Sequence, residues 1–287
     1  LFSADVFIAS DGPRIHPDKP TIFMGSRSVF NFTMRLDSHA GGHHSGNWGG
    51  LLTNPGVVMA HAIASMIDRN GKILIEGWRN TQIPNSVRAA IAKLDVGEGE
   101  NTPDINPNWG EPDLTIAERV FASNTFEVRA FETGNPKSPA NAIPPSAVVF
   151  GHLRYVVGTD ISKLMPLLRA HLDKHGFNDI TITSERDMMP ATRLDPDHPW
   201  AKWAIKSLSK TAEDEIAVIP NLGGALPNDV FADLLGLPTI WVPHSYAGCS
   251  QHAPNEHILE SISKSALRLM TGLWWDLGEG NTPRQVS

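Results

Sequence analysis

Two short apolar runs at opposite ends of this 287-residue chain constrain its fold, because each leads into a side chain that can bind a metal ion. Phe7-Ile8-Ala9 precedes Asp11, and Ile240-Trp241-Val242 leads into the loop that carries His252. Runs of this length are typical of buried strands, and open α/β sheets place ligands at the carboxyl ends of their strands. The sequence therefore predicts an α/β sheet that brings residues 11 and 252 to one cleft.

The segment between these runs has a different pattern. Residues 30–36 alternate apolar and polar side chains, as an antiparallel strand with one solvated face does. Asn54-Pro55 is typical of a helix start, since Asn caps well and Pro is tolerated at the first helical position. We expect an inserted α+β domain, ferredoxin-like with two layers, over residues 22–185. Residues 97–112, rich in Gly, Asn, Pro and acids, read as a loop inside it.

After residue 190 the sequence pattern returns to that of the first segment. A helix around Trp200 to Leu208, a short helix over residues 229–235, a strand over 239–242 and a long helix from about residue 256 alternate along the chain. This order favours a parallel or mixed sheet. We expect residues 1–21 and 186–287 to form one α/β domain, interrupted by the insertion.

Composition excludes some classes of function. The formal net charge of -7 argues against a surface for nucleic acid or anionic membrane. No apolar run approaches the roughly 20 residues of a membrane span. Cys249 is the only cysteine, which rules out an intramolecular disulfide and fits a reducing compartment. The first residues lack the basic and apolar regions of a signal peptide. We expect a cytoplasmic protein.

The candidate site residues are ambiguous one by one. Asp11 follows a strand, but a carboxylate in a Ser-Asp-Gly turn often caps local N–H groups. A lone histidine such as His252 is more often structural than a ligand. His44 lies in a Gly/His-rich loop, where an imidazole can donate a hydrogen bond to an oxyanion, or where the loop is simply mobile surface.

Three further segments have the same ambiguity. Gly224 and Ala225 lie between a strand and a helix, where backbone N–H groups can bind an anion, or form an ordinary turn. Asn141 precedes Ala-Ile-Pro in the middle segment, and Arg154 lies in a strand, where arginine can clamp a carboxylate or be merely exposed. Cys249 near His252 permits a thiol nucleophile, but no orienting partner is evident.

As an ordered set, these segments resemble one family, peptidase family M20. It comprises dinuclear-zinc metallopeptidases and amidohydrolases: carnosinase-like dipeptidases, aminoacylases, acetylornithine deacetylase and succinyl-diaminopimelate desuccinylase. The matching strings occur in family order over nearly the whole chain: Ser10-Asp11-Gly12, Met24-Gly25-Ser26-Arg27-Ser28, His44-Ser45-Gly46, Gly49-Gly50, Asn54-Pro55, Asn141-Ala142-Ile143-Pro144, Arg154, Gly223-Gly224-Ala225-Leu226-Pro227 and His252-Ala253-Pro254-Asn255-Glu256.

The resemblance implies a role for each position. Asp11 resembles the carboxylate ligand of one zinc ion, and His252 the imidazole ligand of the other. His44 resembles the histidine that reaches into the partner subunit's active site and stabilises the tetrahedral intermediate. The middle segment would then be the lid and dimerisation domain of a homodimer.

Substrate contacts follow from the same resemblance. Asn141 matches a substrate-contacting position of the lid, and Arg154 matches the arginine that binds the C-terminal carboxylate of the substrate. Gly224 and Ala225 match a Gly-Ser-Ile-Pro loop. Ala225 replaces the serine, so a hydroxyl contact is lost although the backbone donors remain.

The largest departure from the family is an absence. The family's first half supplies a zinc-binding histidine in His-x-Asp, a bridging aspartate and a Glu-Glu pair. This sequence has no Glu-Glu, and its His-x-Asp matches, His16 with Asp18 and His171 with Asp173, lie in a Pro-rich loop and inside a helix. We expect the chain to be the C-terminal two-thirds of a longer enzyme, inactive by itself.

The expected activity is hydrolysis of peptide bonds with two divalent metal ions, zinc or, as alternatives, cobalt or manganese. The length of the expected lid, residues 22–185, favours a dipeptidase or related exopeptidase such as a carboxypeptidase. An N-acyl-amino-acid deacylase of the same family, an inactive dimerisation or binding module, and an unrelated hydrolase that uses Cys249 are the alternatives.

Overall fold

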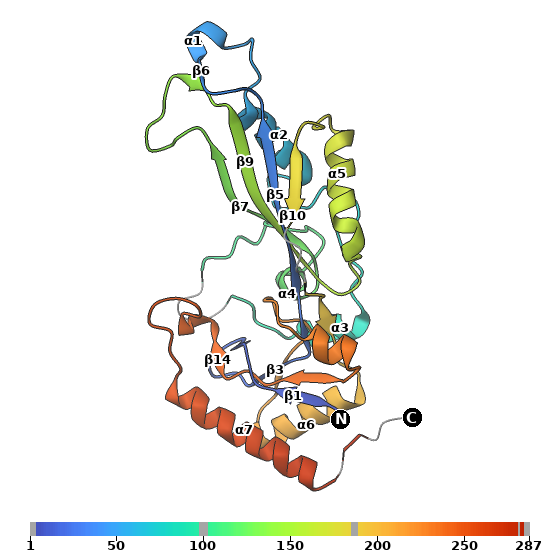
Figure 1. Cartoon of the computed structure of the whole chain (residues 1–287). Helices are drawn as coiled ribbons and strands as arrows, with labels where there is room; N and C mark the ends of the chain where they lie inside the picture. Colours follow the sequence, from blue (N-terminus) through green and yellow to red (C-terminus); the bar gives the residue numbers. More distant parts are fainter. Residues whose placement is uncertain (1–3, 98–102, 185–188, 281, 284–287) are drawn as a thin grey trace.

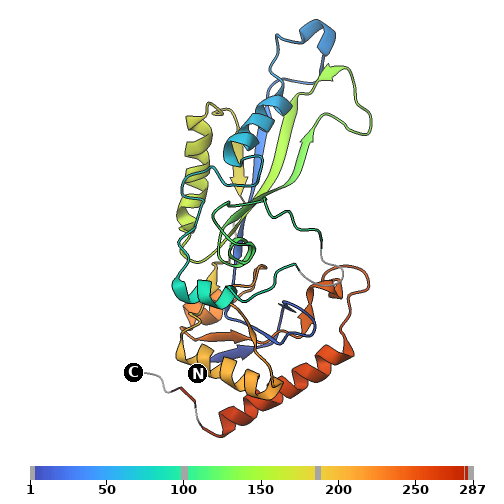
Figure 2. The same ribbon diagram turned by 180° about the vertical axis from the view of Figure 1, so that it is seen from behind.

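The computed structural model describes residues 4–97, 103–184, 189–280 and 282–283. The chain forms an α/β domain that contains the first strand and the last helix of the described residues, and a long lid domain that extends away from it (Figure 1). The view from behind shows the lid sheet rising from the α/β domain, with its helices on one side (Figure 2). An α/β domain with an α+β insertion was predicted, and the structure confirms this fold class.

The sheet of the α/β domain joins residues from both ends of the chain. Its strand order is β1-β13-β3-β12. β1 pairs in parallel with β13, and β12 with β3, whereas β13 and β3 are antiparallel, so the sheet is mixed. The carboxyl ends of β1 and β13 therefore lie at one edge. The strands are β1 (Phe7–Ala9), β3 (Thr21–Phe23), β12 (Ala217–Ile219) and β13 (Thr239–Trp241).

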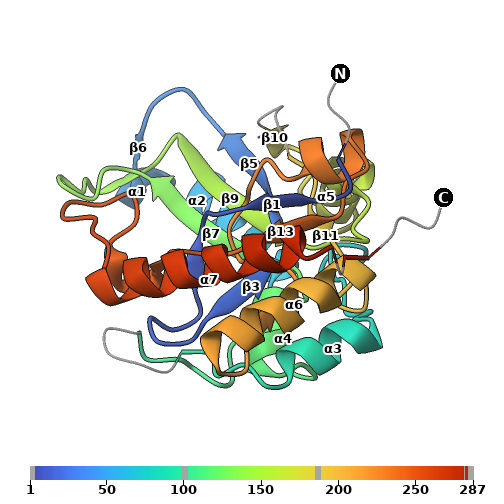
Figure 3. The same cartoon turned by 90° about the horizontal axis from the view of Figure 1, so that it is seen from below.

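Helices cover both faces of this sheet (Figure 3). Because neighbouring strand residues point to opposite faces, Ile240 packs with α6 and α7 while Trp241 packs with the core around α3 and α4. α3 and α4 come from inside the segment 22–185, so part of the insertion packs on the α/β sheet. The helices are α3 (Asn85–Ile91), α4 (Ile116–Phe121), α6 (Pro199–Ala212) and α7 (Glu260–Gly278).

The lid is an antiparallel sheet with strand order β10-β5-β9-β7 and helices on one face. Phe30, Phe32 and Met34 are buried, whereas Asn31 and Thr33 between them are only half-buried, as the alternating pattern predicts. The side chain of Asn54 accepts hydrogen bonds from the first turn of α2, as expected for a cap. The elements are β5 (Ser28–Asp37), β7 (Thr125–Thr133), β9 (Ser146–Tyr155), β10 (Thr181–Ser184), α2 (Pro55–Met66) and α5 (Leu164–Lys174).

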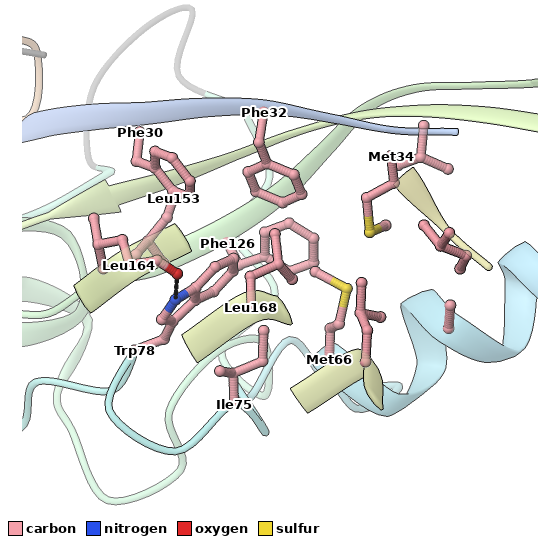
Figure 4. Packing of buried hydrophobic residues seen from close by; sticks show 14 of the residues in the cluster. Phe30, Phe32, Met34, Met66, Ile75, Trp78, Phe126, Leu153, Leu164 and Leu168 are labelled. Carbon is pink, nitrogen blue, oxygen red and sulfur yellow. Dashed lines mark hydrogen bonds between the residues drawn. The ribbon is translucent and has the colours of Figure 1, made fainter. Parts of the chain in front are cut away.

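Aromatic side chains fill the lid core (Figure 4). Trp78 is fully buried and packs against Phe30, Phe32 and Phe126, with ring centroids 5.6 to 6.0 Å apart. Its indole Nε1 donates a hydrogen bond of 3.0 Å to the carbonyl oxygen of Leu164, which satisfies the one polar group of the ring. This core fixes the position of the sheet beneath α5.

Short elements connect the domains and their loops. β4 pairs with β11, which joins the chain entering the lid to the chain leaving it. The short elements are β2 (Pro13–Arg14), β4 (Gly25–Ser26), β6 (His43–His44), β8 (Ala142–Ile143), β11 (Thr192–Arg193), β14 (Ser245–Tyr246), α1 (Ser45–Trp48), the 3-10 turns η1 (Ile161–Lys163) and η3 (Ala247–Cys249), and the π-helical turn η2 (Val230–Leu234).

Two helix boundaries depend on the neighbouring residues. The helix predicted to start at Asn54-Pro55 ends at Met66, because Ile67 turns extended and bridges to Ile73. The final helix begins at Glu260, since the preceding residues close a loop in which the backbone N–H of His257 bonds to the carbonyl oxygen of Cys249. Over the described part of the chain, no helix has the length and apolar character to cross a membrane.

Candidate active site

The segments that carry Asp11 and lead to His252 run side by side. Beyond the β1–β13 pair, β2 and β14 pair in parallel. The hydroxyl of Ser245 donates a hydrogen bond of 2.9 Å to the carbonyl oxygen of Gly12, and Nε of Arg14 donates one of 3.2 Å to that of Pro243. Asp11 therefore lies between β1 and β2, which pair with β13 and β14 respectively, and beside the start of the loop that reaches His252.

Asp11 occupies a tight, exposed turn. One carboxylate oxygen accepts a hydrogen bond of 2.6 Å from the backbone N–H of Gly12. Gly12 has φ +79°, and a Cβ there would come within 3.2 Å of the side chains of Phe23 and Leu222. Glycine is required for both reasons, so the turn that presents Asp11 packs directly on the segment around Leu222.

His252 is exposed in a loop with unusual backbone geometry. Ser250, His252 and Asn255 all have positive φ, between 60° and 65°. The backbone N–H of His252 bonds to Glu256, at 3.3 Å from Oε2. Left-handed non-glycine residues cost free energy and cluster at functional sites. The loop geometry is compatible with a ligand role for His252, which stays a prediction together with that of Asp11.

A complete metal site is not assembled within the described ranges. There, no group of three or more His, Cys, Asp or Glu side chains could hold a metal ion. A carboxylate and an imidazole are suitable donors for zinc, but a catalytic zinc ion uses three protein ligands. Asp11 and His252 therefore have the right donor chemistry and form an incomplete set.

Sequence reasoning missed His244. Its Nδ1 lies 2.6 Å from the hydroxyl oxygen of Ser10, while its Nε2 is buried and has no hydrogen-bond partner among the residues that the structure describes. Burial, followed by repulsion from Arg14, lowers the pKa of His244. Its position just after the apolar run that forms β13 is the signal that could have found it, because strand ends carry site residues.

β6, the strand that carries His44, lies at the end of the lid away from the α/β domain (Figure 1), and Asn141 is bonded to the residue that follows His44. β6 and β8 pair so that His44 lies opposite Ala142. The backbone N–H and the hydroxyl of Ser45 both bond to the carbonyl oxygen of Asn141, at 2.9 and 3.0 Å. The imidazole of His44 is exposed, and its Nδ1 accepts from the N–H of Gly46. Both residues lie far along the lid from the turn of Asp11.

Arg154 lies half-buried on the outer face of the lid sheet, where it pairs with Val29 and Thr125 across the strands. Thr125 in turn accepts a hydrogen bond of 3.5 Å from Nη1 of Arg27. Arg27 is only 7% exposed, and its Nε donates a hydrogen bond of 3.4 Å to the carbonyl oxygen of Gly223. Burial, with repulsion from Arg154 as the second cause, lowers the pKa of Arg27 to about 10.

The loop with Gly224 and Ala225 is held against the entrance to the lid. Leu222 exchanges backbone hydrogen bonds of 2.8 Å with Gly25 and Arg27, and the N–H of Leu226 bonds to the hydroxyl of Ser26. The helix expected after this loop is the π-helical turn η2, which begins only at residue 230, so no helix N-terminus lies at Gly224.

These contacts form one continuous series of neighbouring residues. The turn of Asp11 packs on Leu222, the next residue meets Arg27, and Arg27 leads to the strand face of Arg154. Arg27 was part of a recognised string but had no role assigned, because its contact with Gly223 spans 196 residues. The series begins at an exposed carboxylate, passes the glycine loop and ends at buried and half-buried arginines, and guanidinium groups bind anionic groups well.

Comparison with known proteins relates the chain to one family of peptidases. A family model described as the peptidase dimerisation domain of M20 peptidases matches residues 27–180. The chain is 30% identical over 297 residues to mouse Beta-Ala-His dipeptidase, covering 99% of this chain and 60% of that protein. It is 22% identical over 269 residues to the human Beta-Ala-His dipeptidase, covering 88% and 52%.

Solved structures give the same fold. An M20 family metallo-carboxypeptidase from Sulfolobus solfataricus superposes with a TM-score of 0.78 and 26% identity, covering 94% of this chain and 63% of that protein. The chain spans about half the length of the first curated relatives it matches, between 50% and 55%.

Proposed function

The chain belongs to the M20 peptidase family, and from this premise we propose that it serves a metal-dependent dipeptidase that uses two divalent metal ions. The observation that supports this most is the series of contacts from the turn of Asp11 through Leu222 and Arg27 to Thr125, the cross-strand partner of Arg154. In this series the loop of Gly223 lies between a carboxylate that could bind a metal ion and an arginine of the lid. The relatives named as dipeptidases support the substrate class.

The residues of this chain have different roles in the proposed reaction. Asp11 and His252 hold one metal ion each. When bound, the divalent ions, zinc or alternatively cobalt or manganese, supply Lewis-acid activation of water and of the amide carbonyl. The remaining ligands and the general base come from residues outside the described part of the chain. The coverage of only about half of each curated relative supports this division.

Arg154 orients the substrate by binding its C-terminal carboxylate, for which a guanidinium offers two parallel N–H donors. The backbone N–H groups of Gly224 and Ala225 contact the peptide. A Cβ built at Gly224 would meet nothing within 4 Å, so the loop leaves room for a ligand there. Without a hydroxyl, Ala225 contributes only its backbone.

His44 and Asn141 act in the active site of a partner subunit. Their place at the far end of the lid supports action across a homodimer, since they lie away from the turn of Asp11 in their own chain. The imidazole of His44 then donates a hydrogen bond to the developing oxyanion. A cytoplasmic location fits the single cysteine and belongs to the same proposal.

Mixing two inactive variants of the full-length protein tests this arrangement. Asp11→Ala and His44→Ala should each lose hydrolysis of β-Ala-His and Cys-Gly. A random mixture of subunits should recover about a quarter of wild-type activity, because half of the dimers are mixed and each mixed dimer has one intact site of two. His61→Ala, which removes an exposed lid histidine, is the matched control and should stay active.

Two results would contradict the proposal. Failure of the mixture to recover activity, with mixed dimers shown by native mass spectrometry, would exclude action of His44 across the dimer. Hydrolysis of N-acetyl amino acids but of no dipeptide would replace the dipeptidase with the deacylase alternative. This chain by itself, assayed with added zinc, should be inactive.

A further inference from the structure

Three arginines gather on the outer face of the lid sheet, beside the loop of Gly224. Arg154 on β9 shares this face with His152 two residues earlier. Arg27 donates a hydrogen bond to the hydroxyl of Thr125, which is the cross-strand partner of Arg154. Arg129 lies on β7, at an irregularity in its pairing with β9 between residues 128 and 130.

The described residues supply no ion-pair partner to any of these three arginines. Arg27 instead donates to the neutral oxygens of Gly223 and Thr125 through long hydrogen bonds of 3.4 and 3.5 Å. Arg27 is 93% buried and has no hydrogen-bonded carboxylate among the described residues. A buried guanidinium of this kind is stabilised when a negatively charged group binds nearby.

The surrounding groups leave a net positive charge. Within the part of the chain that the structure describes, Glu127, opposite His152 in the sheet, is the one acid whose charge acts on Arg27. Desolvation raises the pKa of Glu127, and Arg27 opposes this rise. Burial, followed by repulsion from Arg154, Arg129 and Arg27, lowers the pKa of His152 to about 4, which keeps its imidazole neutral at pH 7. Counted over the described residues, three positive charges and one negative charge leave a net charge of two positive units.

Two positive charges exceed what a single substrate carboxylate neutralises. We propose that Arg129 and His152, supported by Arg27, form a subsite for a second anionic group next to the carboxylate on Arg154, so that preferred dipeptides end in aspartate or glutamate. A C-terminal residue with two carboxylates matches the charge of the cluster. This inference rests on the proposed dipeptidase function, and it adds a specificity that the function alone does not require.

The positions of the residues support a division between the two carboxylates. Arg27 is held in place by Gly223 and supplies a fixed charge beneath the site. Arg129 is exposed and lies at the irregularity of β7, and such irregularities re-aim side chains and occur next to active sites. His152 is neutral, so it has a ring N–H to donate without adding repulsion. Arg129 and His152 thus contact the side-chain carboxylate.

Substrate pairs that differ by one charge test the subsite. With the full-length protein, kcat/KM for Ala-Glu should exceed that for Ala-Gln by at least about tenfold, as one charge-assisted hydrogen bond supplies. The same order should hold for Ala-Asp over Ala-Asn. Arg129→Gln should lower kcat/KM for Ala-Glu about tenfold and leave Ala-Gln unchanged within about twofold.

Arg35→Gln is the matched control. Arg35 lies on β5 of the lid sheet and is exposed, but it forms an ion pair with Asp37 at 2.7 Å. Its replacement should not change kcat/KM for either substrate. Equal kcat/KM for Ala-Glu and Ala-Gln in the wild type, or an equal loss for both substrates in Arg129→Gln, would overturn the subsite.

Binding of the products separates this inference from the proposed function. Calorimetry with L-glutamate and L-glutamine on the wild type and on Arg129→Gln needs no hydrolysis. Tighter binding of glutamate that Arg129→Gln abolishes, without cleavage of any dipeptide, would retain the subsite and reject the dipeptidase. Cleavage of dipeptides with equal binding of both amino acids would reject the subsite and retain the dipeptidase.

Discussion

The hydroxyl oxygen of Ser10 lies 2.6 Å from Nδ1 of His244, which joins the residue before Asp11 to the segment after β13. The neighbouring bond from Ser245 to the carbonyl oxygen of Gly12 fixes the other side of the same turn. The turn of Asp11 is therefore held from both sides by residues more than 230 positions away in the sequence.

Loss of the contact between Ser10 and His244 should weaken metal binding in the full-length protein. Residues that orient the ligands of a metal commonly change its affinity by 10 to 100-fold, and we expect about tenfold for Ser10→Ala because the contact acts through the turn. A competition titration with a chelator measures this. Ser263→Ala, which removes a hydroxyl bonded within α7, should bind metal as the wild type does. Unchanged affinity in Ser10→Ala would show that the contact does not position Asp11.

A buried network around Asn228 should control the stability of the α/β domain. Asn228 is fully buried; its Nδ2 donates to the hydroxyls of Thr192 and Thr239 at 2.8 and 3.0 Å, and its Oδ1 accepts from Nε1 of Trp241 at 2.8 Å. Asn228→Leu leaves the indole N–H of Trp241 unpaired and should cost about 3 kcal/mol of unfolding free energy.

Urea unfolding followed by tryptophan fluorescence measures this loss. Asn108→Leu, at an exposed loop position, is the matched control and should change the unfolding free energy by less than about 0.5 kcal/mol. A loss below about 1 kcal/mol in Asn228→Leu would mean that the network is satisfied in another way, for example by water that enters the site.

Local sequence patterns were sufficient for much of this fold. The alternation through Phe30 and Phe32 predicts β5, and Asn54-Pro55 predicts the start of α2, because each signal depends only on residues nearby in the sequence. The apolar runs that form β1 and β13 also predict the sheet edge at which Asp11 and the loop to His252 emerge.

Long-range contacts explain what the sequence did not predict. Arg27 and His244 gain their importance from partners 196 and 234 residues away, and no local pattern reports such contacts. The packing of α3 and α4 on the α/β sheet depends on how the lid folds back, which periodicity does not reveal. The ligand roles of Asp11 and His252 rest on the resemblance to the family and stay predictions.

The neutral imidazole of His152 should make the protein less stable in acid. Burial, followed by repulsion from the neighbouring arginines, lowers the pKa of His152 to about 4 on folding, against about 6.5 in an unfolded chain. Between these values the unfolded state binds more protons, so stability falls as the pH decreases from about 6.5 to 4. His152→Gln removes this contribution, and the difference in Tm between pH 7 and pH 5 should become smaller than in the wild type.

His61→Gln is the control for this measurement, since it removes an exposed histidine of the lid that does not contribute to any of the pKa shifts described. Its pH dependence should match that of the wild type. A His152→Gln variant that loses stability in acid as steeply as the wild type would show that His152 is protonated in the folded protein, and the charge count of the arginine cluster would then have to include it.

The pairing of β4 with β11 makes Gly25 a sensitive position between the two domains. A Cβ at Gly25 would collide with the carbonyl group of Thr192 and lie 2.8 Å from the Cα atom of Arg193, and these are backbone atoms that cannot rotate away. Gly25→Ala must therefore separate β4 from β11 and should cost about 3 kcal/mol, at the upper end for overpacking.

The strain should also reach the candidate site, because the carbonyl oxygen of Gly25 accepts the backbone hydrogen bond of Leu222. We expect dipeptide hydrolysis by Gly25→Ala to fall at temperatures where circular dichroism still shows a folded protein. Gly278→Ala is the matched control: its Cβ meets nothing within 4 Å at the exposed end of α7, so activity and stability should be retained or slightly increased. A Gly25→Ala protein with wild-type Tm and activity would show that β4 and β11 separate without cost, and that the loop of Gly224 does not depend on their pairing.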